Sequence, residues 1–295
     1  MINYSLTIII VTYNSSNLII GCLNKINHNL YDIIVVDNAS TDNTVAVIES
    51  NFPSLKIIKN SKNIGYGRAN NIALRQVETE FAMILNPDAF IFEEEINFII
   101  SSLQDAKEVA IGAPLLLNSY PPNELDISKQ NSIVKSNLIE ETNQYMSVKY
   151  IIGAILFLRM SAFKKIGFFD EDIFLYYEDD EICFRALKSG YKLAIFNAVF
   201  GFHIGSGSSN YNSRVVYKRF WHRALSKLYW KEKSKSKFVA FKSAIRLSVS
   251  FLFKAIFYSL IFKKYDAVKN FASFCGSFAF ILRLKAFDKN DNPRA

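Results

Sequence analysis

Two apolar runs near the N-terminus decide the fold: Leu6-Thr7-Ile8-Ile9-Ile10-Val11 and Ile33-Ile34-Val35-Val36-Asp37. Continuous runs of mainly β-branched residues are typical of strands that are buried on both faces of a parallel sheet. A third strand is expected at 55–58, and apolar residues recur at helical spacing between these runs. Strand, helix, strand, helix and strand at this short spacing predict an α/β fold with a Rossmann-like, mostly parallel sheet and flanking helices.

Residues that favour helix starts precede both of the expected helices. Ser15 and Ser16 stand before the apolar residues of 18–26, and Thr41 or Asp42 stands before the next helix. Their side-chain oxygens can accept hydrogen bonds from the free N–H groups of a first helical turn. We therefore expect a capped helix after each of the first two strands.

Polar residues follow the expected strands at the points where they end. Thr12 and Asn14 follow the first strand, Asp37 and Asn38 close the second, and Asn86-Pro87-Asp88 follows a later one. In open α/β sheets, ligands bind beyond the carboxyl ends of the strands. Asn and Asp also favour turns, which explains each group by itself. Three such groups at one sheet edge favour a nucleotide site.

Four carboxylates stand in a row at Glu178-Asp179-Asp180-Glu181, directly after two tyrosines. Apolar residues recur at helical spacing from Asp180 onward, and Gly190 is well placed to end that helix. Acids in a first helical turn complement the helix dipole, which is the simpler explanation of the cluster. Together with Asp88, the cluster also supplies the two acids that metal-assisted group transfer needs.

Charge is distributed unevenly along the 295 residues. Residues 1–200 carry 16 Lys and Arg against 23 Asp and Glu, whereas residues 201–295 carry 19 against 4. The basic part needs an anionic partner, such as phospholipid, a substrate with a diphosphate, or nucleic acid. This asymmetry predicts two parts with different roles, which we place at 1–212 and, as a basic, aromatic helical region, at 213–295.

The basic region combines cations with apolar helical segments. Residues 214–242 contain ten Lys or Arg and one acid, and residues 244–262 are almost wholly apolar but are interrupted by Arg246 and Lys254. The uncharged stretches are shorter than the ~20 residues that span a bilayer, so we expect helices that lie on an anionic membrane surface. A core helical hairpin and a nucleic-acid surface are the alternatives. Nucleic acid would not need so large an apolar face, so we expect no such partner.

A polar stretch at 118–147 interrupts the apolar pattern. It contains Pro121-Pro122 and scattered Asn, Ser and Lys residues. This composition predicts a flexible loop, which we expect to lie over an acceptor site.

The cysteines indicate a reducing compartment. Cys22, Cys183 and Cys275 lie among apolar neighbours, and an odd number without paired spacing argues against a disulfide framework or a zinc site. The N-terminus also lacks the basic segment and cleavage site of a secretory signal. We therefore expect the chain to act on the cytoplasmic side of a membrane.

The ordered set of motifs resembles a known family, although each motif alone is a weak signal. In chain order the segments are Val11 to Asn14, Val35 to Asp42, Asn63 to Asn71, Leu85 to Asp88, Gly153-Ala154, Gly167 to Glu171, Glu178-Asp179 and His203 to Ser206. The set resembles family 2 glycosyltransferases of the GT-A fold over residues 5 to about 210. It is most similar to the bacterial group that contains rhamnosyltransferases of cell-surface polysaccharide synthesis.

The resemblance implies a binding site for a nucleotide-sugar donor. Asp37 would accept hydrogen bonds from the base or ribose, and Gly65 would let the backbone approach the nucleotide. Arg68 would contact a phosphate, with a solvated residue in a first helical turn as the equal alternative. The residues assigned to the donor are Thr12, Asn14, Asp37, Asn38, Gly65, Arg68 and Asn86.

The resemblance also implies a divalent cation, Mg²⁺ or Mn²⁺. Asn86-Pro87-Asp88 stands where the family has an Asp-x-Asp motif, so Asp88 would be the direct ligand. His203 matches the family histidine that completes the metal or diphosphate site. Gly205 to Ser208 would form a flexible loop that closes over the donor.

Asp179 matches the catalytic base of the family. It would take the proton of the acceptor hydroxyl as that oxygen attacks the anomeric carbon, with inversion through a single displacement. Gly153, Asp170 and Glu178 are assigned to the acceptor side. For Asp170, capping of the following residues is an equally good explanation.

The expected function is transfer of rhamnose or another hexose from a dTDP- or UDP-sugar to a hydroxyl of a lipid-linked saccharide. The expected location is the cytoplasmic face of the bacterial inner membrane, with peripheral or monotopic attachment. One alternative is a sugar nucleotidyltransferase, which would need a Gly-rich, basic triphosphate loop that Val11 to Ser16 lacks. The other is a non-catalytic protein that binds membrane or polysaccharide. The sequence leaves the oligomeric state open.

Overall fold

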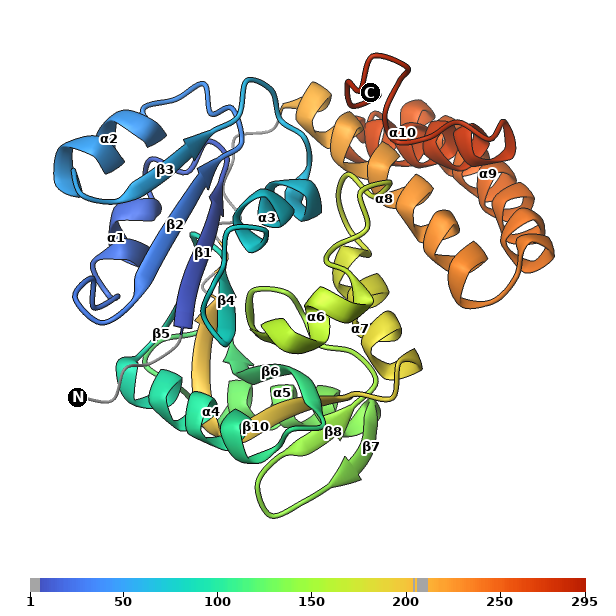
Figure 1. Cartoon of the computed structure of the whole chain (residues 1–295). Helices are drawn as coiled ribbons and strands as arrows, with labels where there is room; N and C mark the ends of the chain where they lie inside the picture. The colour runs from blue at the N-terminus through green and yellow to red at the C-terminus, as the bar shows by residue number, and fades with distance from the viewer. Residues whose placement is uncertain (1–5, 204, 206–211) are drawn as a thin grey trace. The chain divides into compact units, whose positions relative to one another are not determined.

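The computed structural model describes residues 6–203, 205 and 212–295. The chain divides into two compact units, which are described one at a time (Figure 1). The sheet unit takes in Met1–Asn63, Ala69–Phe169 and Ile182–Ser206. The helical unit takes in Gly207–Ala295 together with Ile64–Arg68 and Asp170–Glu181.

Ten strands of the described chain form one mixed sheet in the sheet unit, in the order β3-β2-β1-β4-β9-β6-β10-β8-β7, with β5 paired to β10. The pairs of β1 with β2 and β4, of β2 with β3 and of β6 with β10 are parallel, and the remaining pairs are antiparallel. The strands are β1 (Leu6–Thr12), β2 (Asp32–Asp37), β3 (Lys56–Lys59), β4 (Phe81–Leu85), β5 (Ala89–Ile91), β6 (Val109–Leu117), β7 (Leu138–Glu141), β8 (Met146–Val148), β9 (Ile155–Arg159) and β10 (Lys192–His203). The predicted α/β fold class is confirmed.

The helix that follows β1 is shorter and capped differently than predicted, whereas the helix that follows β2 begins as predicted. α1 covers only Ile19–Leu23 and has no side-chain cap, so the predicted serine caps are wrong. The backbone N–H of Ser15 instead donates to the Thr44 hydroxyl at 2.8 Å. α2 (Thr44–Asn51) begins with a carboxylate of Asp42 that accepts from the Thr44 N–H at 3.0 Å, as one of the two predicted caps would.

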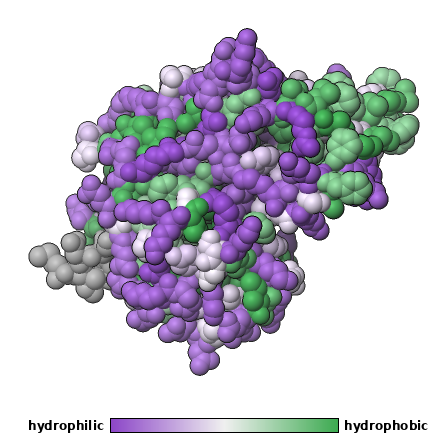
Figure 2. Space-filling model, turned by 45° about the vertical axis from the view of Figure 1, so that its right-hand side comes forward, coloured by the Kyte–Doolittle hydropathy of each residue, from purple (hydrophilic) through white to green (hydrophobic). Residues whose placement is uncertain are grey.

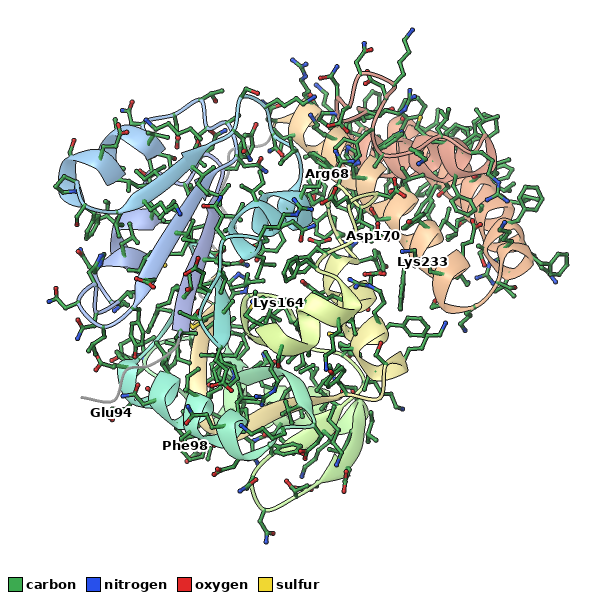
Figure 3. The ribbon with its side chains drawn as sticks, viewed as in Figure 1. Arg68, Glu94, Phe98, Lys164, Asp170 and Lys233 are labelled. Carbon is green, nitrogen blue, oxygen red and sulfur yellow. The ribbon has the colours of Figure 1, made fainter. Side chains whose placement is uncertain are left out.

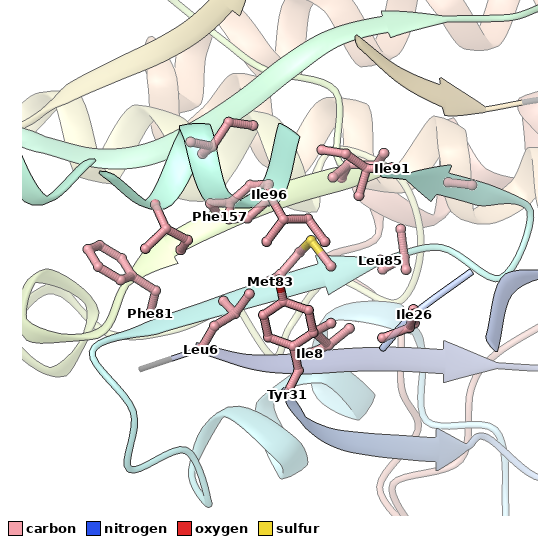
Figure 4. Close-up of a cluster of buried hydrophobic side chains, with 14 of the residues drawn as sticks. Leu6, Ile8, Ile26, Tyr31, Phe81, Met83, Leu85, Ile91, Ile96 and Phe157 are labelled. Carbon is pink, nitrogen blue, oxygen red and sulfur yellow. The ribbon is translucent and has the colours of Figure 1, made fainter. Parts of the chain in front are cut away.

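The core of the sheet unit is aliphatic and surrounds the first strands. Every residue of β1 is buried, as expected for a central strand with helices on both faces. Figure 4 shows Ile8 of β1, Met83 of β4 and Phe157 of β9 in this cluster. α4 (Glu93–Asp105) adds a face of large side chains to the same core: Ile96, Ile99, Ile100 and Leu103.

The polar stretch at 118–147 is not the flexible loop that its composition suggests. It contains α5 (Glu124–Ser136) and the antiparallel pair β7 and β8. Asn123 caps α5 by accepting from the Asp126 N–H at 2.8 Å. The prediction is wrong because a surface helix with only Val134 buried needs few apolar residues.

α6 (Met160–Ile166) and α7 (Glu178–Lys188) lead to β10. α7 starts at Glu178, two residues before the apolar periodicity begins, so all four acids lie in its first turn. Gly190 ends the helix as predicted, with φ of 84°. The N–H groups of Gly190 and Tyr191 donate to the carbonyls of Leu187 and Ala186, which is the Schellman arrangement.

Three long helices make up most of the helical unit: α8 (Ser213–Ser234), α9 (Lys237–Leu260) and α10 (Lys264–Ile281). α3 (Tyr66–Leu74) begins in this unit and continues in the sheet unit. α8 and α10 pack closely because Gly276 has no side chain: a Cβ there would lie 2.2 Å from the Trp221 carbonyl oxygen. Phe174, Phe220, Trp221 and Phe280 belong to a separate core in this unit.

α9 is packed with its small residues inward. It buries Ala240, Ser243, Ala244, Ser248 and Ala255. Its large apolar residues are exposed at spacings of three and four, and we call them the α9 apolar face: Phe241, Ile245, Val249, Leu252, Phe253, Ile256, Phe257 and Leu260. Figure 2 shows hydrophobic side chains gathered over the helical region. Among the described residues, no helix is long and apolar enough to cross a membrane.

Candidate functional site

Two buried polar atoms meet at the carboxyl ends of β1 and β2. Thr12 and Asp37 are register partners on these neighbouring strands and are almost completely buried. Within the described part of the chain, the Thr12 hydroxyl and one Asp37 carboxylate oxygen have no hydrogen-bond partner. Buried polar groups are nearly always paired, so an unpaired couple at a sheet edge indicates a place where a polar ligand binds.

Loop residues surround this couple and hold its edge in place. The second Asp37 oxygen accepts from the Ser40 N–H at 3.0 Å. Asn14 has a positive φ of 52°, and its side-chain oxygen accepts from the Thr41 N–H at 2.8 Å. The Asn38 amide donates to Asn63 at 3.0 Å. These bonds fix both strand-end loops and leave the Thr12 hydroxyl and one Asp37 oxygen unpaired.

Asp88 and His203 form a pair in the same unit, although 115 positions separate them in the sequence. The antiparallel pairing of β5 with β10 sets Ala89 opposite His203, which brings the preceding Asp88 to the histidine. His203 Nε2 lies 3.1 Å from an Asp88 oxygen. Burial alone would raise the pKa of Asp88, but the hydrogen bond and charge of His203 lower it below its ordinary value. The same hydrogen bond raises the pKa of His203.

The pair fits a divalent cation only in part. Carboxylate oxygen and imidazole nitrogen are both metal ligands, and both side chains are partly exposed. Among the residues described, no three His, Cys, Asp or Glu side chains are grouped so that they could hold a metal ion by themselves. A cation here would therefore depend on oxygens from a bound substrate, as Mg²⁺ sites that use substrate phosphates do.

The segment that contains Gly153 and Ala154 lies beside the loop of Asn86 and Asp88. The Asn86 N–H donates to the Ala154 carbonyl at 2.9 Å, and the Asn86 carbonyl accepts from the Ala89 N–H at 3.0 Å. The neighbouring Gly153 is buried. The predicted closing loop at Gly205 to Ser208 lies outside the described residues except for Gly205.

Gly65 and Arg68 belong to the helical unit and have contacts within it. A Cβ on Gly65 would lie 2.4 Å from the Phe174 carbonyl oxygen, so close packing of the chain on itself already requires glycine here. Arg68 Nε donates to the Glu171 carbonyl, and an Nη lies 2.6 Å from an Asp291 oxygen. The Arg68 guanidinium also lies over the Phe287 ring at 3.6 Å. A phosphate contact by Arg68 stays a prediction.

The acidic cluster follows an unusual backbone. Tyr176 and Tyr177 both have positive φ angles, 66° and 70°, a region that bulky residues rarely adopt. Glu178 is buried, and its burial together with the charge of Asp179 raises the pKa of Glu178 to about 8. Burial also raises the pKa of Asp180. Carboxyls held in a low-dielectric setting at a helix start are suited to acid–base chemistry.

Asp170 is engaged in a network that the sequence analysis did not anticipate (Figure 3). One of its oxygens accepts from Lys233 and, at 3.1 Å, from the Tyr229 hydroxyl. Its other oxygen accepts from the Asp172 N–H at 2.9 Å, which is the alternative capping role. Lys233 also lies 3.2 Å from Glu181. Lys233 and Tyr229 lie in a stretch read only as a basic surface, so no local signal identified them.

Comparison with protein families matches residues 7–167, more than half of the chain, to the family described as Glycosyl transferase family 2. The low-salt glycan biosynthesis hexosyltransferase Agl10 of Haloferax volcanii is 26% identical over 67% of this chain and 66% of that protein. The O-antigen chain rhamnosyltransferase WbaN of Salmonella anatum is 27% identical over 74% and 70%. Rhamnosyltransferase WbbL of Escherichia coli is 25% identical over 73% and 88%. The chain thus spans just under two thirds of the archaeal protein.

Solved structures share the fold at low identity. A mannosyltransferase from Pyrobaculum calidifontis in complex with GDP-Man and Mn²⁺ aligns over 94% of this chain and 87% of that chain, with a TM-score of 0.59 and 15% identity. Residues 1–349 of TarS from Staphylococcus aureus align over 93% and 91%, with a TM-score of 0.55 and 16% identity. These neighbours confirm the GT-A type fold. By fold and by sequence, the chain belongs to glycosyl transferase family 2.

Proposed function

We propose that the protein is an inverting glycosyltransferase that moves a hexose, rhamnose by preference, from a nucleoside-diphosphate donor to a hydroxyl of a lipid-linked saccharide. The observation that carries the proposal is the pair of unpaired buried oxygens on Thr12 and Asp37. They lie at the strand edge where α/β sheets bind nucleotides. The family match and the relatives named as rhamnosyltransferases support the sugar class, and they favour transfer over the nucleotidyltransferase and non-catalytic alternatives.

The donor is held by the sheet unit in this proposal. The Asp37 carboxylate accepts hydrogen bonds from the base and ribose, and the Thr12 hydroxyl donates or accepts one, with Asn14, Asn38 and Asn86 at the border of the pocket. The carboxylate of Asp37 is an acceptor for N–H and O–H groups, and it would discriminate nucleotides by their hydrogen-bonding edges. A dTDP- or UDP-sugar is the expected donor.

Asp88 and His203 would hold Mg²⁺ or Mn²⁺ together with the donor diphosphate. When bound, the cation would neutralise negative charge on the leaving diphosphate. Asp88 would contribute the hard oxygen ligand, and His203 in its neutral form would contribute an imidazole nitrogen. The pair would therefore offer the cation one carboxylate oxygen and one imidazole nitrogen, and the donor diphosphate would supply further oxygens.

Asp179 acts as the base. The acceptor hydroxyl gives its proton to the Asp179 carboxylate while its oxygen forms the new bond to the anomeric carbon. The bond from that carbon to the diphosphate oxygen breaks, and its electron pair leaves with the nucleoside diphosphate. Glu178 is mostly protonated near neutral pH, so it can donate a hydrogen bond to the acceptor or to Asp179 without repelling the ionised base.

Attachment to a membrane surface belongs to the same proposal. The α9 apolar face exposes Phe253, Phe257 and Leu260 by 70%, 57% and 72%. Lys254 on α9 and Lys263 and Lys264 just after it supply positive charge beside this face. Apolar side chains with adjacent cations fit the headgroup region of an anionic leaflet, and the bacterial inner membrane, from its cytoplasmic face, is the expected surface.

A transfer assay with the Asp179→Asn variant tests the proposal. The substitution preserves shape and removes basicity, so turnover should fall about 10²- to 10⁴-fold, the usual contribution of a general base, while donor affinity stays unchanged. Asp180→Asn is the matched control and should retain activity. Thermal unfolding with dTDP, UDP and GDP, each with Mn²⁺, identifies the nucleotide, because only a bound one stabilises the fold. Turnover by Asp179→Asn within a few-fold of wild type would refute this assignment of the base.

A further inference from the structure

The N-terminal half of α8 concentrates positive charge. Arg214, Lys218, Arg219 and Arg223 lie within its first three turns, and no acid stands in its first turn. The first turn of a helix carries partial positive charge, so Arg214 is unfavourable there, and the other three cations repel one another along the helix. Burial and then the charge of Arg214 lower the pKa of Lys218. Such a departure from local electrostatic preference is expected at sites that bind an anion.

Two of these cations are held in defined positions by one tyrosine. Arg219 Nε donates to the Tyr176 hydroxyl. The guanidinium carbons of Arg219 and Arg223 lie 5.8 and 5.6 Å from the centre of the Tyr176 ring. Both arginines are exposed, and within the described chain neither is within 4 Å of a carboxylate. Their positions four residues apart put them on one face of α8.

The tyrosine that holds the arginines is part of the segment that carries the proposed base. Tyr176 and Tyr177 have positive φ angles and directly precede Glu178 and Asp179. A strained conformation persists only when surrounding contacts hold it, and the two arginines contact the first of these residues. The arginine pair therefore lies beside the residues that lead to Asp179 within the helical unit.

We propose that Arg219 and Arg223 bind the diphosphate of an isoprenyl-diphosphate-linked acceptor, and that this contact brings the attached saccharide to Asp179. This inference rests on the proposed function. Guanidinium groups match phosphate oxygens with paired hydrogen bonds, and two on one helix face suit two adjacent phosphoryl groups. The donor diphosphate and anionic lipid headgroups share this chemistry, so the experiment must separate all three sources.

The first arm measures binding and needs no turnover. Full-length protein in detergent is titrated with farnesyl diphosphate, with farnesol, and with dTDP or UDP plus Mn²⁺. Arg219→Gln/Arg223→Gln should weaken farnesyl diphosphate binding by about tenfold or more, the scale of losing paired charged hydrogen bonds. Nucleotide affinity should not change. Lys227→Gln/Lys289→Gln is the control because it removes two exposed cations of the same unit. Loss of nucleotide affinity in the arginine variant would assign the pair to the donor and overturn the proposal.

The second arm uses phosphatidylglycerol vesicles. If the arginines bind only lipid headgroups, two results are expected: the arginine variant binds these vesicles more weakly than wild type, and wild type has no affinity for free farnesyl diphosphate. This combination would refute the proposal. If the double variant unfolds, Arg223→Lys replaces it, since it keeps the charge and loses the paired hydrogen bonds. That variant should bind farnesyl diphosphate more weakly than wild type; unchanged binding contradicts the proposal.

The third arm measures transfer to a saccharide on an isoprenyl diphosphate and to the same saccharide on a plain alkyl chain. The arginine variant should raise KM for the first acceptor about tenfold with little change in kcat, and leave the second unaffected. An equal rise in KM with both acceptors would show that Arg219 and Arg223 do not bind the acceptor diphosphate. If wild type transfers to neither acceptor, the proposed function fails, whereas the binding arm still decides the role of the arginines.

Discussion

α4 and α9 are both rich in large apolar residues, yet they bury opposite kinds of side chain. α4, in the sheet unit, buries Ile96, Ile99, Ile100 and Leu103. α9, in the helical unit, buries alanine and serine and leaves most of its phenylalanines exposed. The first pattern is that of a helix with its partner in the same chain. The second indicates a helix whose large apolar face needs a partner outside the chain.

The largest expected effect separates the two helices by stability. Ile99→Ala removes a completely buried side chain and should lower the free energy of unfolding by about 2–5 kcal/mol. Phe253→Ala, on the α9 apolar face, should change it by less than about 0.5 kcal/mol. Urea unfolding followed by far-UV circular dichroism measures both variants. A similar loss for both would mean that α9 is a core helix.

The second effect concerns binding to vesicles. Phe253→Ser/Phe257→Ser removes two side chains that would enter the headgroup region, each with a transfer free energy of about 1.5–3 kcal/mol. Affinity for anionic vesicles should therefore fall about 100-fold or more. Leu125→Ser is the control, because Leu125 is 81% exposed but lies alone on α5 of the sheet unit. Equal vesicle affinity of the double variant and wild type would contradict the membrane role of α9.

The third effect is the acid sensitivity that His222 gives to the helical unit. His222 is completely buried against Phe174, and burial lowers its pKa to about 3. The unfolded chain binds a proton at this histidine below about pH 6.5 and the folded chain does not. The contribution of the neutral His222 to the free energy of unfolding is therefore fully present above pH 6.5 and is lost as the pH falls toward 3. Between pH 6.5 and 4.5 the loss should approach about 2 kcal/mol.

In the His222→Leu variant, the fall in the free energy of unfolding between pH 6.5 and 4.5 that this histidine causes should disappear. In the His28→Leu variant, which is changed in the sheet unit, that fall should remain. Both tryptophans of the chain, Trp221 and Trp230, lie in α8, so fluorescence-detected urea unfolding reports on the helical unit. At each pH, the free energy of unfolding of the variant is subtracted from that of wild type, and the change of this difference with pH tests the prediction. The same slope in wild type and His222→Leu would show that another group causes it.

The smallest effect is that of salt on membrane binding. Cations near an anionic surface contribute about 1 kcal/mol each, and salt screens only this part of the attraction. Raising the ionic strength should weaken vesicle binding of wild type without abolishing it. Lys263→Gln/Lys264→Gln should reduce the salt dependence and leave binding to neutral vesicles unchanged. Binding that ignores both salt and lipid charge would exclude an interfacial arrangement.

Much of the sheet unit could be predicted because its signals are local. Buried strands such as β1 and β4 are continuous apolar runs in the sequence. Gly190 was expected to end a helix because glycine readily adopts the positive φ that it has in the structure. α5 was missed because a polar surface helix with one buried residue resembles a loop in composition. The serine caps before α1 were wrong because the Ser15 hydroxyl donates to the Tyr13 carbonyl, and no side chain caps this helix.

By itself, the sequence determined the α/β class, the motifs at the strand ends and the basic character of the C-terminal region, since each follows from neighbours along the chain. Only the tertiary structure decided that Asp88 meets His203 through the pairing of β5 with β10. It likewise decided that α9 buries alanines and exposes phenylalanines. The physical reason is the same in both cases: strand pairing and helix rotation are settled by contacts between residues far apart in sequence, which periodicity cannot report.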